Sequence, residues 1–288
     1  MLQCIITGIL LGGLYSMIGI GMSLVFGIMG LTNLAHGDLM ILGTYITLVV
    51  TRAAGVPLIL SAVISVVAMC ILGFLIQNFL VNRVMDKGDA PALLVTFGVS
   101  IFLSNLMLRI FGADNQSIPN TLSSQNVITT DVLFVSANYL VSFLIAIVII
   151  IGLNLMMQKT NFGRAIRATS DDAMAAELMG VNTKMAYAVA MVICMGITAV
   201  AGTLVGSTFV FYPSSGTQYL IIAFGVVVIG GMGSLIGTLV GGIVLGLAQL
   251  IGGYVFGSGV QMLVAYVVLL VILALRPNGL FAASAVRK

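Results

Sequence analysis

Long uninterrupted apolar runs are the feature that most restricts the fold of this chain. The runs lie at residues 2–29, 39–51, 57–81, 91–110, 138–157, 185–211, 219–232, 235–252 and 260–275. Most are about 20 residues long, the length at which a helix crosses the hydrocarbon core, whereas a barrel strand would alternate apolar and polar residues. Only 7% of the residues are charged, so lipid must solvate most of the surface. We predict an all-α polytopic membrane protein with about 8–10 transmembrane or re-entrant helices, in one domain over residues 1–288.

The basic residues predict the orientation. Nine of the eleven fall in three regions: Arg83 and Lys87; Lys159, Arg164, Arg167 and Lys184; Arg276, Arg287 and Lys288. The 112–137 segment contains none. Excess Lys and Arg mark the cytoplasmic side. We therefore expect 159–184 to be a cytoplasmic loop and 112–137 an external loop, with the N-terminus outside, the C-terminus inside, and Arg52 and Arg109 as outer exceptions.

Two of the apolar runs are short for a full span. As helices, 39–51 and 219–232 would be only about 20 Å and 21 Å long. Each adjoins a break that contains glycine, "GLTNLAHGD" before the first and "GGMGS" (Gly230 to Ser234) after the second. Such pairs of interrupted segments indicate a transporter pathway between two repeated halves. We predict a weak internal repeat with Gly230, Gly231 and Gly233 at a pathway or hinge; ordinary turns between tilted helices are the alternative.

The first break holds the only histidine of the chain. Asn33, His36 and Asp38 occur together there, in a region with little other charge. The orientation places them towards the inner end of the first helix, and the alternative is that the short segment that follows pulls the motif into the membrane. We interpret them as groups that cap and satisfy backbone at a helix break, with Gly37 allowing the turn. Direct contact with a solute is the alternative.

Three hydroxyl groups form a stripe in the fourth apolar run. Thr96, Ser100 and Ser104 recur every four residues and therefore share one helix face. The stripe could line a hydrated path for a polar solute, or it could bond a neighbouring helix and its own backbone. Both readings stay open.

A glycine face follows the second break. Gly233, Gly237 and Gly241 are spaced by four residues, and Gly242 with Gly246 extends the pattern. Missing side chains let helices approach closely, so this face predicts tight helix packing, within the chain or against a partner.

The cytoplasmic loop is too patterned for a plain linker. Thr169 and Asp172 match the capping pattern of a helix start, Asp171 favours the same helix end, and Gly180 is a plausible stop. The loop predicts a short helix that contains Ala173, Ala175 and Ala176 and is flanked by Arg164 and Arg167. It could lie in the headgroup layer, or it could dock into a groove of a cytoplasmic protein.

Four motifs in this order resemble one family. They are "NLAHGDLMILGTY", "GRAIRATSDDAMAAELMGVNT", "IGGMGSLIGTLVGGIVLG" and "RPNGLF". Together they resemble the branched-chain amino acid ABC-transporter permeases, and "AAELMG" resembles the loop that docks on the ATPase of such importers. Met174 stands where that loop has a glutamate, so either Asp172 or Glu177 would take the acidic role.

The resemblance implies one permease subunit of a prokaryotic importer in the cell (inner) membrane. Its partners would be a paralogous permease, two cytoplasmic ATPases and an external solute-binding protein, which could meet Asp114 and Asp131. This chain lacks the Gly-x-x-x-x-Gly-Lys-Ser/Thr phosphate loop, so ATP and Mg²⁺ are expected on the partner subunits and no cofactor, metal or nucleic acid on this chain. We therefore expect a transport subunit, not an enzyme.

The expected function is inward movement of branched-chain amino acids by ATP-driven alternating access. Arg164, Arg167, Asp171, Asp172, Ala175, Ala176, Glu177 and Gly180 would couple the ATPase to the spans. Closely similar permeases serve urea or short amides, which is one alternative. An ion-coupled secondary transporter is another, and it would need His36 and Asp38 as intramembrane ionisable groups.

Overall fold

The computed structural model describes residues 1–120, 126–130 and 133–281. Within these residues, nine helices are long and apolar enough to cross a membrane. They are α1 (Leu2–Met29), α2 (His36–Ala54), α3 (Leu58–Phe79), α4 (Asp89–Phe111), α5 (Ala137–Lys159), α8 (Thr183–Thr208), α9 (Gly216–Gly230), α10 (Leu235–Phe256) and α11 (Gln261–Leu275). Each coincides with a predicted apolar run, which confirms the all-α polytopic architecture.

The remaining elements are short. They are the helices α6 (Asn161–Asp171) and α7 (Ala173–Leu178), the 3-10 turns η1 (Val81–Arg83), η2 (Met85–Lys87), η4 (Pro213–Ser215) and η5 (Ser258–Val260), and the antiparallel strands β1 (Asn126–Thr130) and β2 (Leu133–Ser136). Three of the 3-10 turns extend spans: η1 extends α3, η4 extends α9 and η5 extends α11. The hairpin belongs to the predicted external loop. Asp131, Arg287 and Lys288 lie outside the described residues.

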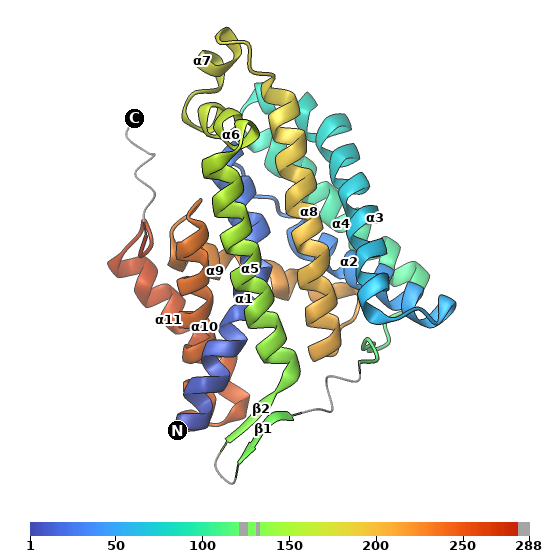
Figure 1. Ribbon diagram of the computed structural model, residues 1–288, viewed down its shortest axis with the longest axis vertical. Helices are drawn as coiled ribbons and strands as arrows, with labels where there is room; N and C mark the ends of the chain where they lie inside the picture. The colour runs from blue at the N-terminus through green and yellow to red at the C-terminus, as the bar shows by residue number, and fades with distance from the viewer. Residues whose placement is uncertain (121–125, 131–132, 282–288) are drawn as a thin grey trace.

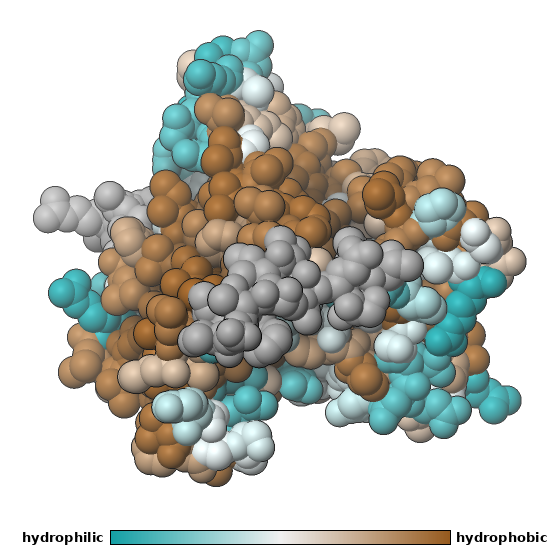
Figure 2. Space-filling view, turned by 60° about the horizontal axis from the view of Figure 1, so that its bottom comes forward, coloured by the Kyte–Doolittle hydropathy of each residue, from teal (hydrophilic) through white to brown (hydrophobic). Residues whose placement is uncertain are grey.

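The helices form a bundle around α1 and α8, most of whose residues are buried. The N-terminus and the β1–β2 hairpin lie at one end, and α6 and α7 project from the other (Figure 1). Exposed leucine, isoleucine, valine and phenylalanine side chains cover the outer faces of α3, α4, α5 and α11. Figure 2 shows this apolar flank in brown, with hydrophilic residues at the projecting tip. The two ends and the belt between them have the polarity of a protein that crosses a membrane several times.

The predicted glycine face packs within the chain, on two neighbours. Gly242 and Gly246 lie on α1, where an added methyl group at Gly246 would meet Gly12 backbone. Gly237 and Gly241 lie on α9, against Gly230 and the Val226 carbonyl. Backbone therefore meets backbone along α10, as helices with small residues permit.

The first break carries the chain back into the middle of the bundle. Helix α1 ends at Gly30, whose φ of 66° is left-handed, and residues 30–35 then run back beside it. At the start of α2, the His36 Nε2 donates a hydrogen bond to the Ile18 carbonyl, 2.8 Å away. Ile18 lies about 16 Å from the C-terminal end of α1. Of the two depths that the sequence left open, the structure therefore supports the deeper one, because the segment between α1 and α2 carries the motif back to the middle of α1.

A second break enters from the other side. After α8, Phe211 exchanges two backbone hydrogen bonds with Gln116 and packs edge-on against Tyr45. The η4 turn follows, and α9 begins at Gly216 against Gly37 of α2. Residues 209–215 thus form a second break, which leads to a helix start beside α2.

The "GGMGS" segment is the tight turn from α9 to α10. Gly231 and Gly233 have left-handed φ angles of 102° and 85°, which favour glycine. The "RPNGLF" motif closes this turn, because the backbone amides of Leu280 and Phe281 donate to the Ile229 and Gly230 carbonyls, at 2.8 and 3.0 Å. Those carbonyls end α9 and have no partner within the helix.

Candidate solute pathway and coupling loop

Asn33 and His36 organise the start of α2 inside the bundle. The Asn33 Oδ1 accepts a hydrogen bond from the Ala35 amide at 3.0 Å, and the Asn33 carbonyl accepts one from the His36 amide at 3.1 Å. Both side chains are buried. The pair therefore supplies backbone partners where the helix begins and ties α2 to α1 through Ile18.

Asp38 and the hydroxyl stripe hold α4 against this start. The Ser100 hydroxyl donates to the Asp38 Oδ2 at 2.5 Å. Thr96 accepts from the Leu34 amide at 3.3 Å and donates to the Leu93 carbonyl at 2.9 Å. Ser104 is half-buried further along the same helix. Two of the three hydroxyls thus face other elements of the chain, so the stripe is no open lining in this conformation.

Gly37 differs from its predicted role. It is not among the glycines with left-handed φ, and it lies inside α2. A methyl group on Gly37 would overlap the Gly216 carbonyl oxygen, and one on Gly216 would overlap the Asp38 carboxylate. Gly37 therefore permits a close approach of α2 to α9, whereas Gly30 makes the turn.

A few polar atoms of this junction have no partner among the described residues. They are the Asn33 Nδ2, the His36 Nδ1 and, in the nearby wall of α1, the Ser23 hydroxyl. In the described part of the chain, no group of three His, Cys, Asp or Glu side chains is placed to hold a metal ion. The junction chemistry is hydrogen bonding to backbone and hydroxyl groups.

The loop that we expect to couple to the ATPase, residues 159–184, folds into two helices, α6 and α7, in place of the predicted one. In α6, Ile166 is fully buried and packs with Leu24, Ile28 and Ala190. Arg164 and Arg167 are exposed; Arg164 donates to the Asn161 side chain and Arg167 to the Met157 carbonyl. The apolar side of α6 thus attaches this loop firmly to the ends of α1 and α8.

Of the two residues predicted to cap α7, Asp172 does so and Thr169 does not. Thr169 lies inside α6 and donates to the Ala165 carbonyl, so it caps nothing. Asp172 is itself the N-cap of α7 and accepts from the Ala175 amide at 3.0 Å. Glu177 accepts a hydrogen bond from Thr183 at the start of α8, and Gly180, with a φ of 83°, lies just after the helix. Asp172 and Glu177, the two candidates for the acidic role, therefore each accept a hydrogen bond within the chain.

The α7 helix also presents apolar side chains that the sequence analysis did not single out. Met174, Leu178 and Met179 are 75%, 85% and 85% exposed at the tip of the molecule, while Ala176 on the opposite side is buried. Met174 and Leu178 are four residues apart and share a face. Three large apolar residues in the run "DDAMAAELMG" were the available signal.

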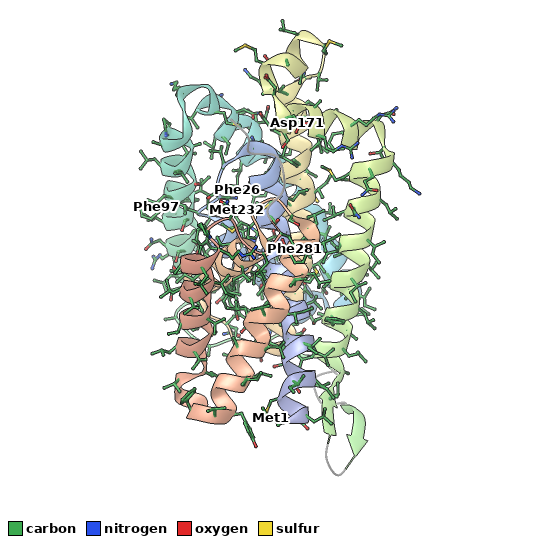
Figure 3. All side chains as sticks on the ribbon, turned by 90° about the vertical axis from the view of Figure 1, so that its left-hand side faces the viewer. Met1, Phe26, Phe97, Asp171, Met232 and Phe281 are labelled. Atoms are coloured by element: carbon green, nitrogen blue, oxygen red, sulfur yellow. The ribbon has the colours of Figure 1, made fainter. Side chains whose placement is uncertain are left out.

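A cavity of about 800 Å³ separates α6 from the α9–α10 turn. Arg167, Asp171 and Asp172 line it from the coupling loop, and Phe26 and Met232 line it from the bundle. Figure 3 shows Phe26 and Met232 between Asp171 and the Met1 end. Beside the cavity, the Ser170 hydroxyl donates to the Gly27 carbonyl at 2.5 Å, and Gly27 packs on Gly233.

The geometry agrees with the similarity of the chain to known proteins. A family profile described as "Branched-chain amino acid transport system / permease component" matches residues 4–273. The high-affinity branched-chain amino acid transport system permease protein BraD of Pseudomonas aeruginosa is 30% identical, over 100% of this chain and 97% of its own length. The corresponding protein LivH of Escherichia coli is 28% identical with the same coverage.

A solved structure shares the fold at lower sequence similarity. PsaBC from Streptococcus pneumoniae in complex with Fab matches with a TM-score of 0.50 and 15% identity, over 96% of this chain and 91% of that chain. Nine apolar helices, four motifs in order and a profile match over nearly the whole length agree with one another. The chain belongs to the family of branched-chain amino acid transport system permease components.

Proposed function

We propose that this chain is the membrane subunit of an ATP-driven importer that moves branched-chain amino acids inward across the cell (inner) membrane. The observation that carries the proposal is α7, which projects from the bundle and exposes Met174, Leu178 and Met179. The full-length relatives BraD and LivH, named for this transport, support it. ATP and Mg²⁺ belong to partner subunits, and the chain itself contributes no enzymatic step.

The exposed face of α7 is suited to a groove on a cytoplasmic ATPase. Apolar side chains outside the bilayer gain free energy when a partner removes them from water. An isolated six-residue helix would not be stable in water, but Asp172 and the Glu177–Thr183 contact hold this one in place. One ATPase per permease gives the two expected ATPases of the complex.

Contacts lead from α7 to the short helix α9. The loop reaches α1 through the Ser170–Gly27 hydrogen bond, and Gly27 packs against Gly233 in the α9–α10 turn. An ATPase that binds one orientation of α7 more tightly would shift the population of the spans towards the matching state. Arg164, Arg167 and Asp171 are exposed, and Arg167 and Asp171 also line the cavity. A partner protein can therefore reach all three.

The opposite end of the bundle is proposed as the outside. It carries the N-terminus and the external 112–137 loop, where Asp114 is exposed and Arg52 bonds Gln116 at 2.7 Å. An external solute-binding protein would dock there and would select the solute, and a paralogous permease would complete the membrane part. Branched-chain amino acids are the favoured cargo, with urea or a short amide as the alternative within the family.

The docking proposal is tested by co-purification. The chain is co-expressed with its candidate ATPase, and Leu178→Asp is compared with Leu2→Asp, which changes an exposed leucine at the other end of the molecule. We expect Leu178→Asp and Gly180→Arg to abolish most co-purification and Leu2→Asp to retain it. Retention of the ATPase by all three variants would overturn the proposal.

The energy source and the cargo are tested in vesicles. Vesicles that contain the whole complex are loaded with ATP and given labelled leucine, isoleucine, valine or urea with the binding protein. We expect leucine uptake that needs ATP and continues without a proton gradient. Uptake driven by a proton gradient in vesicles without ATP would contradict the proposal and favour a secondary transporter.

A further inference from the structure

The N-terminal part of α9 presents polar side chains on the outside of the bundle. Thr217 and Gln218 are exposed, as is Ser214 in the preceding turn, whereas their neighbours Ser215 and Gly216 are buried. Neither the Thr217 side chain nor the Gln218 side chain makes a hydrogen bond to another described residue. These groups differ from the buried polar groups of α2, which are largely bonded within the chain.

These exposed groups lie near the middle of the membrane. Gly216 touches Asp38, and His36, two residues from Asp38, bonds Ile18 in the interior of α1. Ile18 lies about 24 Å from the outer end of α1 and about 16 Å from its inner end. Thr217 and Gln218 directly follow Gly216, so they share this depth.

A lipid-facing position does not fit these side chains. Unsatisfied polar groups in hydrocarbon cost several kcal/mol, and polar residues at this depth face protein or a water-filled cavity. Other exposed residues at mid-span are apolar, for example Val67 in α3 and Val148 in α5. The face of α9 is therefore different from the lipid-facing surface of the same molecule.

The same face changes character along the helix. Ile221 and Phe224 are also exposed, and with Thr217 they follow the spacing of one helix stripe. The stripe thus offers polar groups first and large apolar groups one to two turns further inward. An amino acid with an aliphatic side chain has the same division into a charged end and an apolar end.

We propose that the stripe of Thr217, Gln218, Ile221 and Phe224 lines the solute pathway. Thr217 and Gln218 contact the ammonium and carboxylate groups of a passing amino acid, and Ile221 and Phe224 contact its side chain. A second permease subunit supplies the facing wall. This inference rests on the proposed transport function and names the residues that meet the cargo.

Water access provides the first test. Thr217→Cys and Gln218→Cys are placed in the whole complex and treated with a charged, hydrophilic thiol reagent, and labelled peptides are identified by mass. Val148→Cys is the matched control in the lipid-facing middle of α5, and the native Cys194, fully buried, is an internal one. We expect both pathway positions to react at least tenfold faster than Val148→Cys, and leucine transport to slow their reaction at least threefold. Reaction at the rate of Val148→Cys would overturn the inference.

Transport provides the second test and needs no thiol chemistry. Gln218→Leu should lower the maximal rate of leucine uptake at least fivefold, whereas Val148→Leu should leave it within twofold of the unaltered complex. Unchanged uptake in a folded Gln218→Leu complex would overturn the inference. If the unaltered complex lacks ATP-driven uptake, the proposed function fails; if it has such uptake and only the labelling contrast is missing, this inference alone fails.

Discussion

The two breaks that lead into the middle of the membrane differ in whether the polar residues beside them are buried or exposed. The break before α2 buries Asn33, His36 and Asp38, and each side chain makes a hydrogen bond within the chain: Asn33 to the Ala35 amide, His36 to α1 and Asp38 to α4. After the break before α9, Gly216 at the helix start is buried, but the next two residues, Thr217 and Gln218, are exposed. The first break therefore stabilises the fold, and the second offers polar groups to something outside this chain.

This contrast separates two reasons for polarity at membrane depth. A helix that starts inside the bilayer has unsatisfied backbone groups, and side chains that bond them remove a cost of several kcal/mol. Polar groups that bond nothing in the chain carry that cost unless water or a partner meets them. Substitutions at the first break should therefore change stability, and those at the second should change transport.

The largest effect is expected where the two breaks touch. Gly37→Ala would place a methyl group on the Gly216 carbonyl oxygen, and neither backbone can move without shifting a helix. We expect a loss of about 3 kcal/mol or more, seen as a lower thermal unfolding temperature in detergent. Gly98→Ala is the control, since open space surrounds Gly98 on α4 and alanine should stabilise that helix by about 1 kcal/mol. Equal unfolding temperatures for the two variants would refute the close-packing role.

A smaller loss is expected at Asp38. Asp38→Ala removes the acceptor of the Ser100 hydroxyl and should cost about 1–3 kcal/mol, measured by the same unfolding assay. Asp38→Asn keeps an acceptor oxygen at this position and should retain most of the stability. An equal loss in Asp38→Asn and Asp38→Ala would show that the carboxylate charge, not the acceptor oxygen, holds this junction.

A still smaller effect is expected at His36. His36→Gln can keep a donor towards the Ile18 carbonyl, so leucine uptake should stay within about twofold of the original. His36→Leu removes the donor and should cost about 1 kcal/mol of stability. Loss of uptake in a His36→Gln protein that unfolds at the normal temperature would give His36 a direct part in transport.

The smallest effect on stability is expected at the second break. Thr217→Val and Gln218→Ala remove exposed groups without partners in the described chain, so the free energy of unfolding should change by no more than about 0.5 kcal/mol. Thermal unfolding and leucine uptake are measured on the same preparation. A large drop in the unfolding temperature would remove the distinction between the two breaks.

The spans were predictable because each needs a long apolar run. Helices α1 and α3 end within a few residues of the runs 2–29 and 57–81, since lipid selects length and composition without regard to neighbours. The depth of His36 was not predictable from charge, because a short extended segment can move a motif through half the membrane. Similarly, "YPSSG" before Thr217 resembles a surface turn, and only its contact with Asp38 reveals its depth.

The sequence predicted which types of residue matter in the site, but not which residues they would contact. The glycines of α10 indicated close packing, yet their spacing could not tell that α1 and α9 are the neighbours. The same holds for Gly37, which as a sequence element fits a turn as well as a close approach. Asp172 and Thr169 fitted one capping pattern, and only the break between α6 and α7 shows which of them caps a helix.

The packing of α1 on α10 has a consequence for how the protein is made. Gly8 and Gly12 near the start of the chain need Gly242 and Gly246, which are synthesised more than 200 residues later. Helix α1 must therefore wait in the membrane, with its glycine face uncovered, until α10 has been inserted. Contacts so distant in sequence form late and leave intermediates open to wrong pairing. A chain that stops before α10 would have its central helix without the surface that closes the bundle.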